Sequence, residues 1–176
     1  MTKTVRFLLL TCTSLLSACA SRQAPLRTVQ HVDLKRYMGD WYVIANIPTF
    51  IEKGAHNAVE SYRLDADGSI AVTFTFRDGA FDGPPKKYTP RGFVRNDLSN
   101  AIWGMQFIWP IKADFRITYL AQDYSQTIIS RENRDYVWIM ARTPTIPEAD
   151  YQRLLKIVEA QGYDQDKIQK VPQQWK

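Results

Sequence analysis

The sequence predicts an all-β domain built from eight antiparallel strands, with one α-helix after the last strand. Short runs rich in β-branched and aromatic residues alternate along the chain with clusters of Gly, Pro, Asn and Asp, a pattern typical of a meander. Only one segment, near the C-terminus, carries apolar residues at helical spacing. Of the 176 residues, 45% are hydrophobic and 23% charged, which suffices for one packed core and argues against disorder.

The first residues have the features of an export signal. Lys3 and Arg6 precede an apolar run, residues 7–16, which is too short to span a bilayer as a stable helix. The run leads into Leu-Ser-Ala-Cys at residues 16–19, which resembles the lipobox of bacterial lipoproteins. The resemblance implies a signal peptide at residues 1–18 and lipid attached to Cys19. The alternative is an ordinary secretory signal that happens to contain a cysteine.

Residues 19–30 are expected to form a lipidated tether and residues 31–176 the folded domain. The tether segment shows no periodicity. Its lipid would hold the protein on a membrane almost irreversibly. Residue 20 is Ala and not Asp, which by resemblance to lipoprotein sorting implies the outer membrane, on its periplasmic face.

Cysteine and charge content exclude several classes of function. Cys12 would leave with the signal and Cys19 would carry lipid, so the folded part has no thiol for a disulfide, a thiolate metal site or a nucleophile. Loss of Lys3 and Arg6 lowers the formal net charge from +5 to about +3. This mild excess does not predict a nucleic-acid partner.

The first half of the domain predicts three clear strands and one defective strand. Trp41–Ile47 is ended by Pro48, and Ala58–Leu64 is followed by an Asp-Gly pair, a strong hairpin signal. Ile70–Arg77 alternates apolar and wettable residues in strict order. The fourth run, Lys87–Arg95, contains a proline at position 90, which predicts an edge-like site or a bulge there.

The second half predicts four more strands and the helix. The strands are residues 101–107, 113–121, 126–130 and 136–142, most of them separated by turn clusters. Thr145 and Glu148 have the spacing of a capping box, with Thr145 at the N-cap. Tyr151, Leu154, Leu155 and Val158 then form an apolar stripe that should pack on the outside of the sheet, and Gly162 can end the helix.

Two motifs distinguish a barrel from a sandwich. Gly39-Asp40-Trp41 follows a short helical segment and opens the first strand, and the segment 135–146 contains the last strand and Arg142. Both resemble bacterial lipocalins, and the resemblance covers about residues 31–171. A third lipocalin motif is degraded, with Ala121 where Asp is expected, although Tyr124 remains.

The resemblance implies a fold and a function. The fold is an eight-stranded up-and-down antiparallel barrel with the C-terminal α-helix packed outside. Gly39, Trp41 and Arg142 would close the barrel base, the guanidinium stacking on the indole. Among lipocalins the nearest subgroup is the outer-membrane lipoprotein Blc type. It implies a membrane-anchored protein that binds fatty acids or lysophospholipids for storage or transport in envelope maintenance, and a homodimer is a further option.

Alternation of inward and outward side chains gives a list of candidates for the lining of a ligand cavity. The candidates are Ile70, Val72, Phe74, Phe76, Phe107, Phe115, Ile117 and Tyr119. Some of them could instead pack against the helix on the outer face, because a period of two does not say which face is inside. The apolar loop Phe107–Ile111 could be a flap over the mouth, a membrane-contacting tip, a dimer contact or part of the core.

No pattern in the sequence predicts catalysis, a cofactor or a metal site. His31 and His56 belong to no metal or triad motif. The turn after the second strand begins like a calcium loop but has Phe76 at its twelfth position. Two alternatives to a lipid carrier stay open. One is a carrier of haem or another small hydrophobic ligand, with His56 as a haem ligand. The other is a structural envelope lipoprotein that acts through protein contacts.

Overall fold

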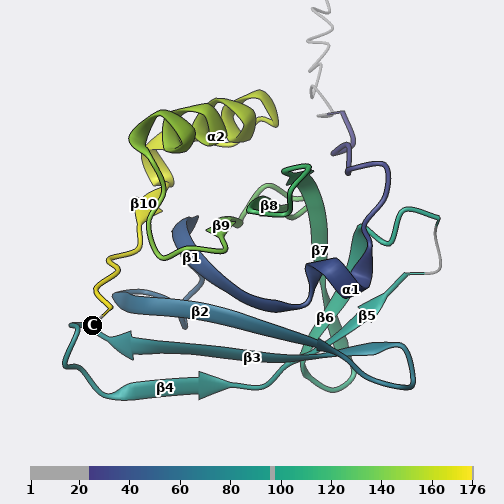
Figure 1. Cartoon of the computed structure of the whole chain (residues 1–176), viewed down its shortest axis with the longest axis horizontal. Coiled ribbons are helices and arrows are strands. Elements are labelled where there is room, and N and C mark those ends of the chain that lie inside the picture. The colour runs from purple at the N-terminus through teal and green to yellow at the C-terminus, as the bar shows by residue number, and fades with distance from the viewer. Residues whose placement is uncertain (1–23, 96–97, 176) are drawn as a thin grey trace, which may run out of the picture.

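One antiparallel sheet contains every strand of the computed structural model, which describes residues 24–95 and 98–175 (Figure 1). The strands are β1 (Gly39–Ile47), β2 (Ala55–Leu64), β3 (Ser69–Asp78), β4 (Pro85–Tyr88), β5 (Arg91–Val94), β6 (Ile102–Ile108), β7 (Ile111–Leu120), β8 (Gln126–Ser130), β9 (Val137–Ala141) and β10 (Gln169–Lys170). The helices are α1 (Leu34–Tyr37), α2 (Glu148–Ala160) and the 3₁₀ helix η1 (Gln165–Lys167).

The sheet closes on itself to form a barrel. From β1 to β3 and from β5 to β9 each strand pairs with the next along the chain, and β1 pairs antiparallel with β9, from Tyr42 opposite Ala141 to Ile47 opposite Val137. β4 and β5 both pair with β3 and together occupy the fourth place, so eight strands surround the axis. The predicted eight-stranded up-and-down barrel is thereby confirmed. The interruption between β4 and β5 contains Pro90, whose carbonyl still accepts a hydrogen bond from the amide of Val72 at 3.1 Å.

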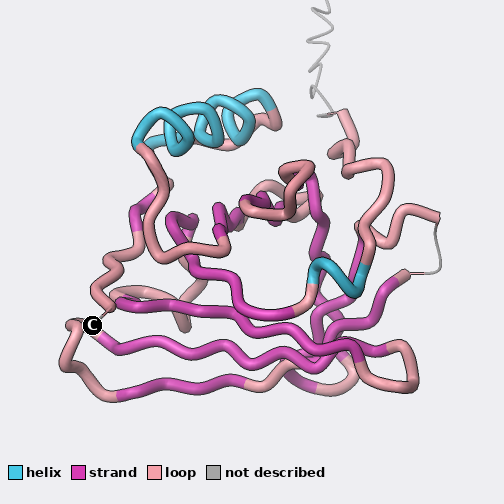
Figure 2. Tube along the Cα trace, viewed as in Figure 1, coloured by secondary structure: helices cyan, strands magenta, loops and turns pink. Residues whose placement is uncertain are grey.

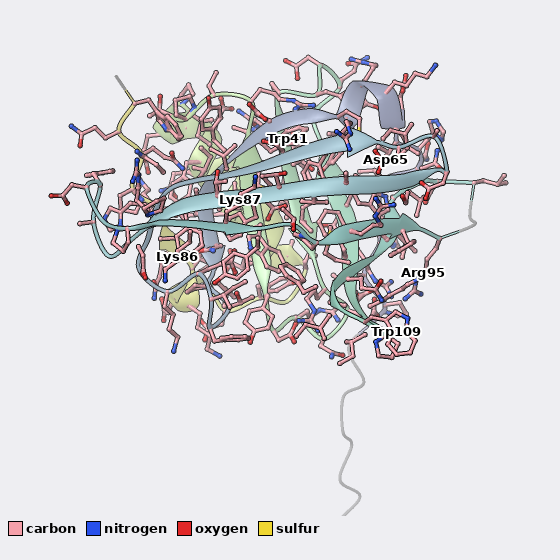
Figure 3. All side chains as sticks on the ribbon, turned by 90° about the horizontal axis from the view of Figure 1, so that it is seen from below. Trp41, Asp65, Lys86, Lys87, Arg95 and Trp109 are labelled. Carbon is pink, nitrogen blue, oxygen red and sulfur yellow. The ribbon has the colours of Figure 1, made fainter. Side chains whose placement is uncertain are left out.

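The connections alternate between two ends of the barrel. At the open end lie the β1–β2, β3–β4, β6–β7 and β8–β9 connections, and at the closed end lie β2–β3, β5–β6 and β7–β8 together with α1. Figure 3 shows Trp109 at the lower edge of the molecule and Trp41 inside its upper half. The closed end is filled by aromatic rings, with Tyr37 5.0 Å from Trp41, 5.5 Å from Trp103 and 5.8 Å from Tyr62 between ring centroids.

The helix α2 lies on the outside of the barrel, as predicted, and is not part of the barrel wall (Figure 2). Its buried residues Tyr151, Leu154 and Val158 pack in a second apolar cluster with β8, β9 and part of β1. The predicted capping box is wrong. Pro147 occupies the N-cap position, where its backbone is extended and no side chain caps the helix with a hydrogen bond. Thr145 therefore lies before the N-cap and outside the first helical turn. The Thr145 carbonyl instead accepts from the Thr143 hydroxyl at 2.7 Å.

The described chain begins along the barrel wall. Leu26 is buried, and its amide donates to the carboxylate of Glu132 in the β8–β9 connection at 3.3 Å. Further on, the Val29 amide donates to Ile117 of β7 at 3.0 Å. Residues 24–30, expected as part of the tether, therefore lie against the barrel, while Cys19 and the signal segment lie outside the described residues. Within the described ranges no helix has the length and apolarity needed to cross a membrane.

Candidate ligand-binding cavity

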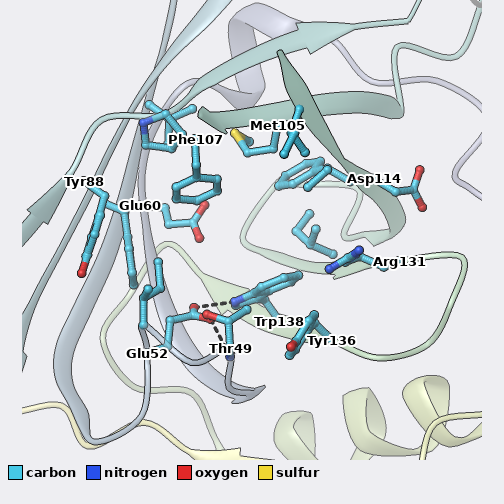
Figure 4. Close-up of a pocket in the computed structure, with 18 of the residues that line it drawn as sticks. Thr49, Glu52, Glu60, Tyr88, Met105, Phe107, Asp114, Arg131, Tyr136 and Trp138 are labelled. Carbon is cyan, nitrogen blue, oxygen red and sulfur yellow. Dashed lines mark hydrogen bonds between the residues drawn. The ribbon is translucent and has the colours of Figure 1, made fainter. Parts of the chain in front are cut away.

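The barrel contains a cavity of about 660 Å³ that reaches the open end (Figure 4). This volume is in the usual range for sites that bind one small molecule. Most of the wall is apolar. The lining consists of Thr49, Phe50, Ile51, Glu52, Glu60, Val72, Phe74, Tyr88, Pro90, Met105, Phe107, Ile108, Ile111, Ala113, Asp114, Phe115, Ile129, Arg131, Tyr136 and Trp138.

Four of the eight predicted residues line this cavity. Val72 and Phe74 come from β3, Phe107 from β6 and Phe115 from β7. The strict alternation of β3 turns its apolar side chains inward, since successive side chains of a strand point to opposite faces. The burial pattern of β3 repeats this alternation, with Thr73 only partly covered between two buried neighbours.

The other four predicted residues lie elsewhere. Ile70 and Ile117 are fully buried in the packed core and do not line the cavity. Phe76 shares the inward face of β3 and packs with its ring centroid 5.2 Å from that of Phe74, but it is not part of the lining. Tyr119 lies under α2, where its hydroxyl accepts from Arg153 at 2.8 Å. A register shift between Ile117 and Tyr119 separates these two side chains, so simple alternation fails at this point of β7.

Glu60 is the least expected member of the lining. It stands opposite Trp41 and Phe74 in the sheet register, and its carboxylate accepts a hydrogen bond from the Tyr62 hydroxyl. Burial raises the pKa of Glu60 to about 7, and the nearby carboxylate of Glu52 adds to the rise. Sequence reasoning missed this residue because its charge suggests an outward position, although Ala58, Glu60 and Tyr62 share an inward period of two.

Glu52 is a second buried carboxylate, and its role is to hold the β1–β2 connection. Its two oxygens accept from the Trp138 indole at 2.7 Å, the Thr49 hydroxyl at 2.6 Å and the Thr49 amide at 3.0 Å. The Asn46 side chain adds a longer hydrogen bond at 3.4 Å. A buried carboxylate satisfied in this way fixes the segment that carries Phe50 at the cavity mouth.

Arg131 supplies a cation to the cavity wall. Figure 4 shows its guanidinium and the carboxyl of Glu60 pointing into the cavity from opposite sides. The guanidinium lies 5.3 Å from the centre of the Tyr136 ring, and Nη1 lies 3.4 Å from a carboxylate oxygen of Asp135. Among the described residues its Nε is one of two buried side-chain polar atoms without a hydrogen-bond partner. The guanidinium is therefore only partly satisfied by hydrogen bonds.

The predicted closure residues meet at the closed end. The guanidinium of Arg142 lies 3.8 Å above the Trp41 ring and donates to the carbonyls of Asp40 at 2.8 Å and Tyr37 at 2.9 Å. Gly39 adopts a φ of +93°, and a Cβ there would lie 3.4 Å from Nη1 of Arg142. The site therefore combines a left-handed backbone with close approach of the arginine, which favours glycine.

The histidines lie outside the cavity lining. One ring nitrogen of His31 is 3.1 Å from the Leu98 carbonyl, and one of His56 is 2.9 Å from the Gly54 carbonyl. Across residues 24–95 and 98–175 no group of three or more His, Cys, Asp or Glu side chains is arranged to hold a metal ion.

Comparison with known proteins agrees with the geometry. The family model described as lipocalin-like domain matches residues 32–173. The chain belongs to the lipocalin family. This lipocalin is 29% identical to the outer membrane lipoprotein Blc of Citrobacter freundii over 88% of each chain. It is 30% identical to temperature-induced lipocalin-1 of Arabidopsis thaliana, over 84% of this chain and 83% of the relative.

Solved structures show the same lipocalin fold. Insecticyanin from the tobacco hornworm superposes with a TM-score of 0.67 at 14% identity, covering 84% of each chain. The cockroach allergen Per a 4 superposes with a TM-score of 0.62 at 16% identity, covering 84% of this chain and 92% of the allergen. Family membership makes this lipocalin a binding protein for small hydrophobic ligands, similar to Blc, and not an enzyme.

Proposed function

We propose that this lipocalin binds a fatty acid or a lysophospholipid for storage or transport in envelope maintenance. The observation that carries the proposal is an apolar cavity of about 660 Å³ whose lining includes the partly unsatisfied guanidinium of Arg131. An acyl chain fits the apolar wall, since burial of apolar surface stabilises by about 25 cal/mol per Å². A cation beside that wall suits an amphiphile with one anionic group.

The anionic group of the ligand would contact Arg131. A guanidinium binds carboxylates and phosphates through paired hydrogen bonds, so it fits both the carboxylate of a fatty acid and the phosphate of a lysophospholipid. The tail would then extend toward Val72, Phe74 and Phe115.

The protein would act from the outer membrane, anchored through lipid on Cys19. Support comes from the lipobox-like residues 16–19, with the signal peptide at 1–18, and from relatives named as outer membrane lipoproteins. Ala at position 20, where Asp is absent, supports the outer membrane and its periplasmic face. Mass spectrometry of the chain purified from membranes would test the anchor, because a diacylglyceryl group adds a defined mass to Cys19.

Ligand binding can be tested with a fluorescent fatty acid. We expect saturable uptake, displacement by lysophospholipid and little displacement by haem, whose iron would find no histidine in the lining. Ala113→Trp places bulk in the cavity and should reduce affinity about tenfold or more. Thr73→Trp adds the same bulk to the outer face of β3 and is the matched control.

Each outcome selects one function. Uptake that Ala113→Trp weakens and Thr73→Trp does not would support the lipid carrier. Uptake of haem in preference to lipid would replace the proposed ligand by another small hydrophobic one. A folded, delipidated barrel that takes up neither would contradict the proposal and favour a structural lipoprotein that acts through protein contacts.

A further inference from the structure

Large apolar side chains are exposed mainly at the open end of the barrel. Four of them form the mouth rim, with exposed fractions of 83% for Phe50, 72% for Ile108, 83% for Trp109 and 68% for Ile111. Phe107, at 51%, continues the rim toward the cavity. Within the described ranges the remaining exposed large apolar residues are Phe81, Leu98 and Trp175, of which Phe81 lies in the β3–β4 connection, also at the open end.

An apolar rim of this kind is unusual on a surface that faces only water. Soluble proteins seldom expose contiguous apolar patches, and larger ones mark contacts with proteins or membranes. The rim contains a tryptophan at the tip of the β6–β7 hairpin, and tryptophan prefers the interface between lipid head groups and acyl chains. Phe50, Ile108 and Ile111 also line the cavity, so the rim is continuous with its wall.

The N-terminal segment, residues 24–32, begins at the open end of the barrel. Arg134 of the β8–β9 connection donates to the Ala24 carbonyl at 2.5 Å, and that connection lies at the open end. From there the segment runs past β7 to the closed end, where the Val32 amide donates to Ser99 at 2.8 Å. The first described residue is therefore at the open end.

Covalent geometry limits how far Cys19 can lie from Ala24. Five residues of fully extended chain span at most about 18 Å. A strand such as β3, with ten residues, is about 33 Å long, and at the usual tilt of barrel strands it spans roughly 25 Å along the barrel axis. Since this length exceeds the reach of the short segment, lipid on Cys19 would keep the open end near the bilayer and prevent the closed end from facing it.

We propose that the mouth rim docks on the surface of the phospholipid bilayer that carries the protein, so that the cavity opens directly onto lipid. The inference rests on the proposed lipid anchor at Cys19. A ligand would then pass between bilayer and cavity along an apolar path formed by the rim, and its acyl chain would not have to cross water. Exchange of ligand with that membrane would be fast compared with exchange through solution.

The test uses the full-length lipoprotein in vesicles of phosphatidylethanolamine and phosphatidylglycerol. Brominated lipids in the vesicles quench tryptophan fluorescence on contact, and we expect the quenched component to disappear in Trp109→Tyr, which removes the indole but keeps an interfacial ring. Transfer of a fluorescent fatty acid from vesicle to barrel should slow about tenfold in Trp109→Ser and recover in Trp109→Tyr. Leu98→Ser removes an exposed apolar side chain at the closed end and should change neither signal.

Separate measurements distinguish a failure of the proposed lipid anchor, of the proposed ligand and of the proposed membrane docking. Trp109 does not line the cavity, so Trp109→Ser should keep the wild-type affinity for fatty acid in solution within twofold. Absence of lipid on Cys19 in the mass spectrum would contradict the proposed lipid anchor. Absence of fatty-acid uptake in solution would contradict the proposed ligand. Unquenched Trp109 in an anchored protein would overturn the docking proposal. So would a rim protected by a second copy of the chain, seen as concentration-dependent dimers in sedimentation.

Discussion

At the scale of single residues, Glu60 makes the stability of the barrel depend on pH. Burial raises its pKa from the ordinary value of 4.5 to about 7, and the charge of Glu52 adds to this, while the hydrogen bond from Tyr62 opposes it. Because the pKa is higher in the folded chain, the folded state holds a proton that the unfolded state releases as pH rises. The stabilisation is therefore fully present below about pH 4.5 and is lost as pH rises through 7.

Glu60→Gln should remove this dependence. The amide is neutral at every pH and can keep the hydrogen bond with Tyr62, so the variant should exceed the wild type by about 2–3 kcal/mol in unfolding free energy at pH 8. At pH 4.5 the two proteins should be nearly equal. Urea unfolding at both pH values measures the difference. A gap that is the same at pH 4.5 and pH 8 would show that Glu60 titrates normally in the cavity.

Arg142 acts at the closed end of the barrel, where its planar guanidinium stacks on Trp41 and donates to three carbonyls. Lysine cannot reproduce this fork, so Arg142→Lys should lower the unfolding free energy by about 2–3 kcal/mol. The affinity of the folded protein for ligand should stay within twofold, because Arg142 does not line the cavity. Arg63→Lys, at an exposed ion pair with Asp65, is the matched control and should be nearly neutral. Loss of ligand affinity at full stability would contradict a purely structural role for Arg142.

At the scale of elements, the sequence predicts strands better than it predicts what each side chain faces. The alternation of β3 places Val72 and Phe74 correctly, because this strand is regular along its whole length. On β7 the register shift after Ile117 sends Tyr119 to α2, and no residue pattern marks this shift in the sequence. Charged members of the lining such as Arg131 are also hidden from a hydrophobicity pattern, because only tertiary packing brings them into the cavity.

The start of α2 gives a prediction at this scale. Since Pro147 holds the N-cap position, the Thr145 hydroxyl is not a cap, and Thr145→Ala should change the unfolding free energy by less than about 0.5 kcal/mol. Leu154→Ala, in the fully buried stripe of the same helix, should cost about 2–5 kcal/mol. Thermal or urea unfolding of both variants provides the comparison. If Thr145→Ala lowered the free energy of unfolding by about 1 kcal/mol or more, the result would support the capping box.

At the scale of the whole molecule, the barrel has two ends with different tasks. Aromatic packing and Arg142 fill the closed end, whereas the open end keeps a cavity and an exposed apolar rim. The motifs around Trp41 and Arg142 predict the barrel because they belong to its closed base. The position of the N-terminal segment could not be predicted, since residues 24–30 have no periodicity and are held by contacts with the distant Glu132 and Ile117.

This segment leads to the last prediction, which concerns where the domain begins. A chain that starts at residue 31 loses the buried side chain of Leu26 and the hydrogen bond from Val29 to Ile117. We expect its free energy of unfolding to be about 2–4 kcal/mol lower than that of a chain that starts at residue 24, because the apolar burial and the hydrogen bond are both lost. Urea unfolding of the two chains measures the difference, and a chain from residue 24 with Leu26→Ala should account for most of it. Equal stability would mean that residues 24–30 act as a free tether. The distance from Cys19 to the barrel would then be longer, and it would no longer keep the open end toward the bilayer.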